Sequence, residues 1–345
     1  MRILFVRLSS FGDVVFALPA AKALRTSLPG ARLAWTIEGP LAGLLEGAAY
    51  VDEILAANTR VWRKSILGKK TREEIRDFLR RGKEFAPELI IDAQGLFKSA
   101  LITAAFSAVR KVGFGFRTAT ERINCLFTDE HVEAADRPHV ADQMLALAEH
   151  VTGKSGFERT PDVRHLVEKK DPVVDSWLDR IGGQRFAVLQ PFSSKANKEW
   201  ATGDVIAFAH RLSSDGIQPV LRWGPGEESR ADELLTLSKK SSSSSPSSSS
   251  SNSLSLLLAP PTSPASTARL AARAALFVGA DTGPTHLAAA AGTPTLALFG
   301  PTPVERFGPV GPRVAVLRES PEDYNRSPTK WPADAVHEAV RRLLA

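Results

Sequence analysis

Residues 1–26 read MRILFVRLSSFGDVVFALPAAKALRT, a stretch that contains a strand, a turn and a helix in succession. The run ILFV at residues 3–6 has the length and continuous apolar character of a strand that is buried on both faces of a parallel sheet. Small and polar residues at 9–12 predict a turn, and residues 14–26 predict a helix. The stretch therefore predicts the first strand and helix of an α/β protein.

The same alternation continues through two blocks of the chain, before and after a polar seam near residues 155–185. Each block has the rhythm of a doubly wound parallel sheet, so we expect an N-terminal domain over residues 1–165, a C-terminal domain over 166–331 and a closing helix at 332–345. The predicted strands cover residues 3–6, 32–37, 51–55, 89–92 and 111–114 in the first block and 186–190, 218–223, 254–258, 276–278 and 295–299 in the second. The predicted helices cover residues 14–26, 71–85, 96–109, 202–213, 229–237, 267–275, a segment opened at 281–286, and 332–344.

The composition of the 345 residues excludes several classes of protein. With 43% hydrophobic and 24% charged residues, the chain has an ordinary globular balance. Its single cysteine, Cys125, excludes a disulfide framework and a cysteine-rich zinc module. The net charge of +6 suits an anionic ligand or a membrane surface but is too diffuse to indicate nucleic acid, so we expect no nucleic-acid partner.

Two stretches of the sequence indicate where the chain is disordered and where in the cell the protein is located. The tract SSSSSPSSSSS at residues 241–251 cannot bury enough apolar surface to order itself, and it predicts a disordered insertion. Arg7, Ser9 and Asp13 interrupt the N-terminal apolar run, which is unlike a secretory signal, and no stretch of 18 apolar residues occurs. We expect a cytoplasmic protein, with contact to a membrane surface left open.

Four strand-to-helix turns carry polar side chains, and in open α/β sheets ligands bind at such turns, at the carboxyl ends of the strands. In the first turn Asp13 follows Ser10 and Gly12 where a helix begins. A helix N-cap is one interpretation of Asp13. The other is a carboxylate that acts as a general base, because the helix N-terminus keeps it ionised.

The second and third turns carry groups suited to sugars and phosphates. Gln94 and Lys98, in the turn after residues 89–92, either cap that turn and face solvent or contact the hydroxyls of an acceptor. The turn after residues 186–190 combines hydroxyl and ammonium groups, which suit a phosphate, with a solvated loop as the alternative. Its candidate phosphate ligands are Ser193, Ser194, Lys195 and Lys198.

The fourth turn is the most distinctive and comprises Asp281, Thr282, Gly283, Pro284, Thr285 and His286. Gly283 permits a close approach to a ligand, and the N–H groups of the helix start can hold a pyrophosphate, whereas a lone His286 is more often structural than catalytic. In the loop WGPGEE, Glu227 or Glu228 can bind ribose hydroxyls. The chain has no Asp-x-Asp pair, HExxH or GxxxxGK[ST] pattern, so we expect no metal and no cofactor.

Together these motifs resemble glycosyltransferase family 9, the ADP-heptose:lipopolysaccharide heptosyltransferases. The resemblance rests on MRILFVRLSSFGDVVFALPA, IDAQGLFKSA, SSKANKEW, WGPGEE and GADTGPTHLAAAAGTPTLALFGPT, and it extends from residue 1 to about residue 303. The DAQGL-x-KSA run and the basic cluster at residues 60–64 are most similar to heptosyltransferase I. The resemblance implies a GT-B fold, with two Rossmann-like domains that face each other across a cleft and a last helix that can pack back on the first domain.

The resemblance also implies roles for individual residues. Asp13 matches the catalytic base, and Lys198 matches the lysine that meets the donor phosphates. The implied donor site contains Ser193, Ser194, Lys195, Glu227 or Glu228, Asp281, Thr282, Gly283 and His286. The implied acceptor site contains Ser10, Gly12, Arg60, Arg63, Lys64, Gln94 and Lys98, with Arg117 or Arg122 in place of an arginine that the family pattern puts near Thr120. For the cluster at residues 60–64 a solvated basic loop is the alternative.

The activity implied by the resemblance is inverting transfer of L-glycero-D-manno-heptose from ADP-heptose to the Kdo of Kdo2-lipid A, by a monomer at the inner face of the inner membrane. Heptosyltransferase II or III, acting on a heptosylated core, is the nearest alternative. Two other classes stay open. One is a non-catalytic nucleotide-sugar-binding protein, which Asp13 and Lys198 argue against, and the other is a sugar-nucleotide epimerase of the same architecture.

Overall fold

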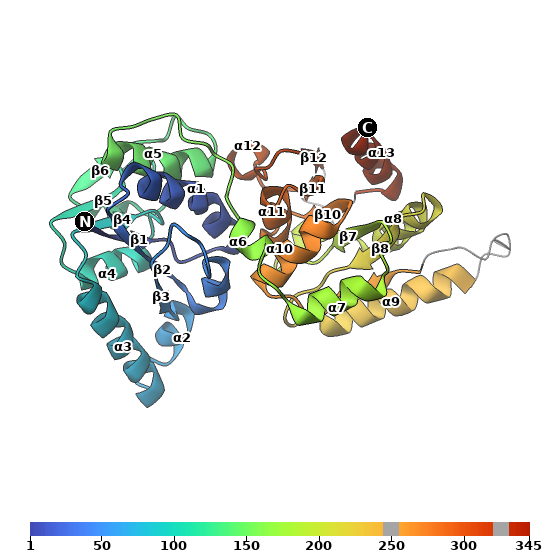
Figure 1. The fold of residues 1–345 in the computed structure, drawn as a ribbon, viewed down its shortest axis with the longest axis horizontal. Coiled ribbons are helices and arrows are strands. Elements are labelled where there is room, and N and C mark those ends of the chain that lie inside the picture. Colours follow the sequence, from blue (N-terminus) through green and yellow to red (C-terminus); the bar gives the residue numbers. More distant parts are fainter. Residues whose placement is uncertain (244–254, 320–330) are drawn as a thin grey trace. The chain divides into compact units, whose positions relative to one another are not determined.

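A computed structural model of the chain describes residues 1–243, 255–319 and 331–345 (Figure 1). Their contacts divide the chain into two compact units, Met1–His165 and Leu166–Ala345, and each is described here by itself. Each unit contains one six-stranded sheet in which every pair of neighbouring strands is parallel. The prediction of two doubly wound α/β domains is therefore confirmed.

The sheet of the first unit has the strand order β3-β2-β1-β4-β5-β6. The chain winds outward from β1 to β3 and then returns to β4 on the other side of β1, so the winding direction changes between β1 and β4. A crevice forms beyond the carboxyl ends of the strands at such a switch point, and ligands bind there. The strands are β1 (Arg2–Val6), β2 (Arg32–Glu38), β3 (Glu53–Ala57), β4 (Leu89–Asp92), β5 (Arg110–Phe114) and β6 (Glu130–Val132).

Helices cover both faces of this sheet, which explains the continuous apolar run in β1. On one face, Leu4 and Val6 pack in the same apolar cluster as Phe78 and Phe106. On the other face, the ring of Phe5 meets the ring of Trp35 edge to face, with 4.6 Å between their centroids. Helices α1 and α5 lie side by side on one face (Figure 1). The helices are α1 (Phe11–Ser27), α2 (Thr59–Lys64), α3 (Lys69–Phe85), α4 (Phe97–Ala105) and α5 (Val140–Thr152), with short 3-10 segments η1 (Gly39–Leu44) and η2 (Arg122–Phe127).

The second unit repeats the topology, with the strand order β12-β11-β10-β7-β8-β9. Its switch point lies between β7 and β10, the counterparts of β1 and β4. The strands are β7 (Phe186–Gln190), β8 (Gln218–Leu221), β9 (Leu257–Leu258), β10 (Leu276–Ala280), β11 (Thr295–Phe299) and β12 (Val314–Arg318). The helices are α6 (Arg164–Val167), which begins just before the boundary, α7 (Pro172–Arg180), α8 (Thr202–Ser214), α9 (Glu228–Ser243), α10 (Pro264–Arg273), α11 (Gly283–Ala290), α12 (Val304–Phe307) and α13 (Ala333–Leu344), with the 3-10 segment η3 (Ala196–Lys198).

The closing helix α13 belongs to the second unit. Val336 and Val340 of α13 are buried in the same apolar cluster as Phe208 of α8 and Leu298 of β11. Each buried side chain of this size contributes about 1.5–3 kcal/mol, so the apolar stripe of α13 has a large stabilising partner on its own unit.

Two regions differ from the sequence-based expectations. The polar seam contains helix α7, which Asp171 caps by accepting hydrogen bonds from the N–H groups of Val173 and Val174 at 3.0 and 3.1 Å. Only Val174 and Trp177 of α7 are buried. The rest of the segment is mostly polar, so its sequence gives little indication of a helix. Helix α9 continues into the first three residues of the serine tract, where we predicted disorder, and residues 244–251 of that tract lie outside the described residues.

Within the three described ranges of the chain, none of the helices has both the length and the apolar character needed to cross a bilayer.

Candidate functional site

Asp13 lies at the third position of α1, at the switch point of the first unit. Its Oδ2 accepts hydrogen bonds from the backbone N–H of Ser10 at 3.0 Å and from the Ser10 hydroxyl at 2.7 Å. Ser10, not Asp13, is the N-cap residue, and Gly12 is buried beside it in the first turn. The Asp13 side chain is 22% exposed, so a ligand can reach this carboxylate, which its neighbours hold in one orientation.

Arg7 is a residue of this site that the sequence reasoning missed. Its Nη2 lies 3.0 Å from Oδ1 of Asp13, and its Nη1 donates to the carbonyl of Ala93 at 2.6 Å. The Arg7 side chain is only 6% exposed, and Asp13 supplies the anion that a buried cation requires. Arg7 directly follows the first strand and is the only cation in the turn at residues 7–13. That position is the sequence signal that could have marked Arg7 as a site residue.

Gln94 is a predicted acceptor ligand. In the structure its side chain also holds the turn at Ser9. Its Oε1 accepts from the N–H groups of Leu8 and Ser9 at 2.8 and 3.2 Å, and its Nε2 donates to the Ser9 carbonyl at 2.9 Å. Backbone groups therefore occupy most of the amide's hydrogen-bonding capacity, and the side chain is buried. Gln94 ties the turn after β4 to the turn after β1, across the switch point.

The turn after β4 is itself organised by a buried carboxylate. Burial raises the pKa of Asp92, while hydrogen bonds from Asn124, at 2.7 Å, and from the N–H groups of Gly95 and Gln94 oppose that rise. Gly95 has φ +67°, a left-handed conformation that favours glycine, and this conformation lets its N–H point at Asp92. Asp92 thus fixes the turn and is not exposed to a ligand.

Lys98, a predicted acceptor ligand, lies near Asp13, and its hydrogen bond is with Ser9. Its Nζ donates to the Ser9 hydroxyl at 2.6 Å. Burial lowers the pKa of Lys98, and so does the charge of nearby Arg60, whereas buried Glu38 raises it. Glu38 ends β2 and accepts from the Thr59 hydroxyl at the start of α2, so it joins α2 to the site. The sequence analysis did not single out Glu38.

The basic cluster of α2 lies next to this network. Arg60, Arg63 and Lys64 are exposed, and none of them has an ion-pair partner among the described residues. Arg60 is close enough to influence Lys98, which links the cluster electrostatically to the Asp13 turn. Arg122 is exposed at the start of η2, and among the described residues no hydrogen bond or ion pair links its side chain to Asp13.

In the second unit, three predicted donor residues form one connected group at the switch point between β7 and β10. The Lys198 Nζ lies 2.6 Å from Oδ2 of Asp281, and Nε2 of His286 lies 3.2 Å from Oδ1 of the same carboxylate. Burial alone would raise the pKa of Asp281, but the hydrogen bond from His286 and the Lys198 charge hold it well below its usual range. Asp281 is therefore an anion that orients both a cation and an imidazole.

The N-terminus of α11 lies directly after Asp281. Thr282 is its N-cap residue and Gly283 its first residue, so the positive end of the helix dipole lies at the carboxyl edge of the sheet. Pro284 has no N–H, and the N–H of Thr285 donates to the Thr282 carbonyl at 3.1 Å. Thr285 turns back to the Ala280 carbonyl at 2.7 Å and fixes the start of the helix. A helix start of this kind favours phosphate oxygens.

The loop after β7 presents its remaining predicted ligands to solvent. Ser194 and Lys195 are exposed, and the Ser193 hydroxyl accepts from the N–H of Lys195 at 3.2 Å. Glu199 holds the loop from the other side, because it accepts from the N–H of Ser193 at 3.2 Å and pairs with Arg230 at 2.7 Å. The loop is thus shaped by its own hydrogen bonds, with Lys198 the member that reaches Asp281.

A pocket of about 190 Å³ lies at the carboxyl ends of β8 and β9. These strands follow β7 in the sheet, so the pocket is on the side of β7 away from β10. Trp223 and Pro225 give it apolar walls, and Thr262 and Ser263 give it hydroxyls. Glu228 lines the pocket as well. These are the surfaces that a nucleoside base and its ribose require.

The structure separates the two glutamates that the sequence leaves equivalent. Glu227 accepts from the N–H of Gly224 at 2.6 Å and closes its own turn, near buried Arg222, whose pKa burial lowers to about 10. Arg222 in turn donates to Gln190 at 2.7 Å, at the end of β7. Glu227 therefore supports the loop, and Glu228 is the carboxylate that a ligand can reach.

We expect Glu228→Ala to raise the KM for a nucleotide substrate about 10- to 100-fold with little change in kcat, since a hydrogen bond to a charged group contributes about 1.5–3 kcal/mol. Glu227→Ala is the matched control and should lower the melting temperature instead, because it leaves the buried Gly224 N–H unpaired. Steady-state kinetics and thermal melts of both variants test this assignment, and the reverse pattern would contradict it.

Within the parts of the chain that the structure describes, no group of three or more His, Cys, Asp or Glu side chains is arranged to hold a metal ion.

Comparison with known proteins identifies the family. The family model described as glycosyltransferase family 9 (heptosyltransferase) matches residues 76–331, which is more than half of the chain. The chain belongs to glycosyltransferase family 9. It is therefore a glycosyltransferase, and the predicted family and enzyme class are confirmed.

Relatives match this family 9 chain over nearly its whole length. Lipopolysaccharide heptosyltransferase 1 of Escherichia coli (strain K12) is 27% identical over 327 residues, which cover 94% of this chain and 95% of that protein. Lipopolysaccharide heptosyltransferase 1 of Pseudomonas aeruginosa is 29% identical over 306 residues, 88% of this chain and 79% of that protein.

The fold of the family 9 chain is that of a GT-B heptosyltransferase. The solved structure of E. coli heptosyltransferase WaaC with ADP has a TM-score of 0.83 and 26% identity, and the match covers 99% of this chain and 100% of that one. A bacterial UDP-N-acetylglucosamine 2-epimerase is similar in fold alone, with a TM-score of 0.54 and 14% identity.

Proposed function

We propose that this family 9 glycosyltransferase transfers L-glycero-D-manno-heptose from ADP-heptose to the Kdo of Kdo2-lipid A, with inversion at the anomeric carbon. Two full-length relatives are lipopolysaccharide heptosyltransferases 1, and the similar solved structures of WaaC contain ADP and an ADP-heptose analogue. The observation that carries the proposal is the reachable Asp13 carboxylate at the switch point of the first unit.

Asp13 is proposed to take the proton from the acceptor hydroxyl. The carboxylate is oriented by Ser10 on one oxygen and by Arg7 on the other, so it need not reorganise when the acceptor arrives. Arg7 places its positive charge 3.0 Å from Oδ1 of Asp13, beside the carboxylate that is to accept the proton. Proton removal of this kind accelerates a reaction by about 10²–10⁴-fold. The acceptor oxygen then attacks the anomeric carbon on the face opposite the leaving ADP.

The leaving ADP gains negative charge as the glycosidic bond breaks, and this chain supplies cations and dipoles for it. Lys198 can exchange its partner Asp281 for a phosphate oxygen, and the positive end of the α11 dipole, at Gly283, lies at the same edge of the sheet. Ser193, Ser194 and Lys195 are proposed to contact the phosphates from the loop after β7. The nucleoside is proposed to occupy the pocket lined by Trp223 and Glu228.

The acceptor carries negative charge on Kdo carboxylates and lipid A phosphates. Arg60, Arg63 and Lys64 on α2 are exposed, and they adjoin the Asp13 site through Glu38 and Lys98. We propose that these three cations hold the acceptor's anionic groups, that Arg122 extends the same surface, and that the enzyme works as a monomer at the inner face of the inner membrane.

Release of ADP tests the reaction class. We expect ADP to form when ADP-heptose and Kdo2-lipid A are both present and to form only slowly without the acceptor. Consumption of the sugar nucleotide at the same rate without any acceptor would instead indicate an epimerase or a hydrolase. Tight binding of ADP-heptose with no turnover in either reaction would indicate a binding protein.

A further inference from the structure

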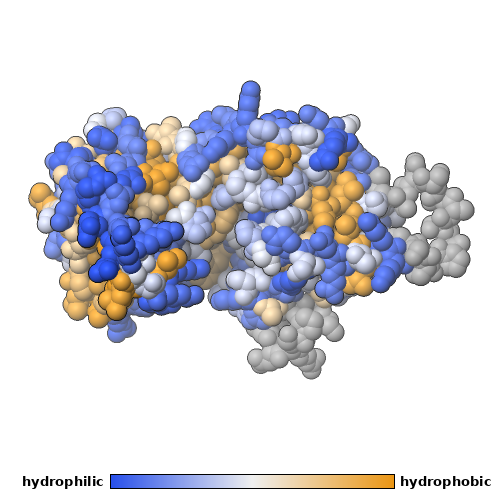
Figure 2. Space-filling model, turned by 90° about the horizontal axis from the view of Figure 1, so that it is seen from below, coloured by the Kyte–Doolittle hydropathy of each residue, from blue (hydrophilic) through white to orange (hydrophobic). Residues whose placement is uncertain are grey.

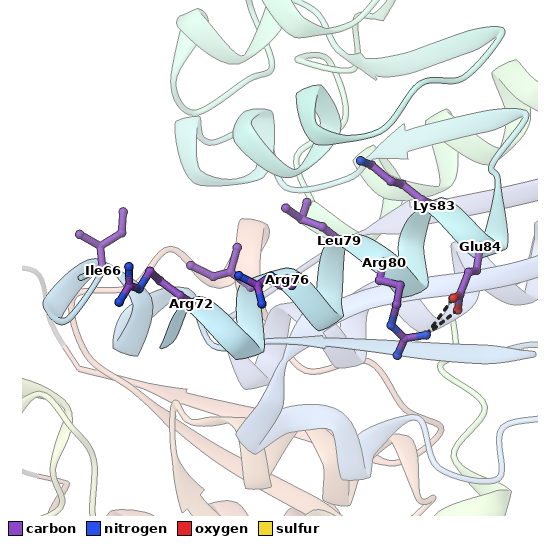
Figure 3. Close-up of a pocket in the computed structure, with 8 residues that line it drawn as sticks. Ile66, Arg72, Arg76, Leu79, Arg80, Lys83 and Glu84 are labelled. Atoms are coloured by element: carbon purple, nitrogen blue, oxygen red, sulfur yellow. Dashed lines mark hydrogen bonds and ion pairs between the residues drawn. The ribbon is translucent and has the colours of Figure 1, made fainter. Parts of the chain in front are cut away.

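One side of helix α3 carries cations and apolar side chains and lies apart from the proposed site. It lines an open groove of about 910 Å³ (Figure 3). Arg80 and Glu84 line the groove together with six other residues, and we define the α3 basic face by those six, Ile66, Arg72, Ile75, Arg76, Leu79 and Lys83. The opposite side of the helix buries Phe78 and Phe85 in the core, so α3 is amphipathic in an unusual way, with a second, partly apolar side turned to solvent.

The cations of the α3 basic face are available to a partner. Among the described residues no ion pair involves Arg72, Arg76 or Lys83. Arg80 differs, because it pairs with Glu84 at 2.8 Å, and Figure 3 shows it turned toward that carboxylate while Leu79 and Lys83 point to the other side of the helix. Arg80 and Glu84, which also line the groove, thus neutralise each other, and the charges of Arg72, Arg76 and Lys83 remain beside the apolar residues.

The excess positive charge of the whole protein is concentrated here. Residues 59–84 contain ten Lys and Arg against four Asp and Glu, a net charge of +6, and the net charge of the entire chain is also +6. The rest of the chain is therefore neutral on balance. A field of one sign confined to α2, α3 and the turn between them attracts an anionic surface.

Apolar side chains stand exposed within this charged segment. Leu67 is 84% exposed, Ile66 62% and Val61 54%, at the turn that joins α2 to α3. On the face drawn in Figure 2, hydrophobic and strongly hydrophilic surface adjoin over the first unit. Exposed leucine and isoleucine beside unpaired cations are typical of helices that lie in the interface of a lipid bilayer.

We propose that the α3 basic face and the Ile66-Leu67 turn form a docking surface for an anionic phospholipid bilayer. The cations would meet lipid phosphates, and the Ile66-Leu67 turn would enter the boundary between headgroups and acyl chains. A nucleic acid fits less well, because the surface interleaves its cations with aliphatic side chains and exposes no aromatic ring for bases among the groove-lining residues.

This surface deepens the proposed function, because it would hold the first unit on the bilayer that contains a lipid acceptor. Its test nevertheless needs neither donor nor acceptor. Binding to vesicles of phosphatidylcholine and phosphatidylglycerol, without any lipid A, can succeed or fail whatever the chain transfers. Failure of the docking surface and failure of the proposed function are therefore distinguishable.

The test is flotation of the full chain with vesicles of phosphatidylcholine and phosphatidylglycerol in a two-to-one ratio, and with phosphatidylcholine alone. We expect binding to the anionic vesicles only. Each cation near such a surface strengthens binding about fivefold, so the triple variant Arg72→Gln, Arg76→Gln, Lys83→Gln should bind about 100-fold more weakly. A matched triple, Lys154→Gln, Lys170→Gln, Arg185→Gln, removes the same charge from exposed positions elsewhere and should bind like the wild type.

A second variant tests the apolar half of the surface. Ile66→Ser, Leu67→Ser leaves the charge unchanged and should weaken vesicle binding about tenfold, while binding to the polyanion heparin stays as in the wild type. Equal vesicle binding by the two triple variants, or no binding by the wild type, would overturn the docking surface. Unchanged vesicle binding by the Ile66, Leu67 variant would overturn the insertion of that turn.

Discussion

Replacing Asp13 by Asn is expected to lower kcat for heptose transfer at least about 100-fold, because it removes the proposed general base. Asn keeps the size of the side chain and can still accept a hydrogen bond from the Ser10 hydroxyl, which now holds Asp13 at 2.7 Å. Affinity for ADP-heptose should stay within a few-fold, since the proposed donor residues belong to the other unit. Steady-state kinetics and ADP-heptose binding measure the two effects separately.

The matched control for Asp13 is Asp142→Asn. Asp142 is also an acid in the first turn of a helix of the first unit, and it pairs with Arg159 at 3.0 Å. It should leave transfer unchanged. If Asp13→Asn retained more than about a tenth of the wild-type kcat, Asp13 would be only part of the Ser10 cap, and another group would have to be the base.

Lys198→Ala is expected to reduce turnover of ADP-heptose about 10- to 100-fold, with little change in binding of the lipid acceptor. A charge-assisted contact to phosphate contributes about 1.5–3 kcal/mol, and more if the contact strengthens as the leaving group gains charge. Lys195 is exposed in the same loop and can compensate in part, so Lys195→Ala alone should have a small effect and the double variant should be worse than Lys198→Ala. Kinetics for both substrates, with and without EDTA, measure these effects.

Lys198→Ala also breaks a buried ion pair, so its stability must be measured alongside its activity. It leaves Asp281 with His286 as a remaining partner, and removing one member of a buried pair costs about 3–5 kcal/mol. Lys22→Ala, which breaks a more exposed ion pair with Asp162 at 2.9 Å in the first unit, is the control for loss of a lysine–aspartate pair away from the site. Near wild-type turnover by Lys198→Ala, or loss of wild-type activity in EDTA, would contradict a leaving group stabilised by protein cations.

The sequence was sufficient for most of the strands, because parallel strands buried on both faces are continuous apolar runs. β1 and β7 are such runs, and both can be predicted as strands from the sequence. β12 was missed because its residues are only half-buried at the edge of the sheet, so its composition is less distinctive. Helix α5, whose apolar side packs on α1, was not predicted either.

The candidate site was predictable in its polar residues but not in their partners. Asp13, Lys198, Asp281 and His286 lie at strand ends, where polar residues stand out from apolar neighbours. What the sequence could not give was pairing between turns that are distant along the chain, such as Gln94 with Ser9 or Lys198 with Asp281. Such pairing depends on which strands are adjacent, and that is a property of the sheet order.

The roles of charged residues within one loop were equally hidden. Glu227 and Glu228 are neighbours with the same chemistry, yet one closes a turn and the other lines the pocket. In the sequence Arg7 interrupts an apolar run, and nothing there shows that its guanidinium turns back to Asp13.

The acceptor is the central claim, and the mass of the product tests it most directly. The wild-type enzyme is incubated with ADP-heptose and either Kdo2-lipid A or its heptosylated form, and the lipids are analysed by mass spectrometry. We predict that Kdo2-lipid A gains the mass of one heptose and that the heptosylated form gains none. Addition of heptose to the heptosylated form alone would contradict the claim and would indicate a heptosyltransferase that acts later in core synthesis.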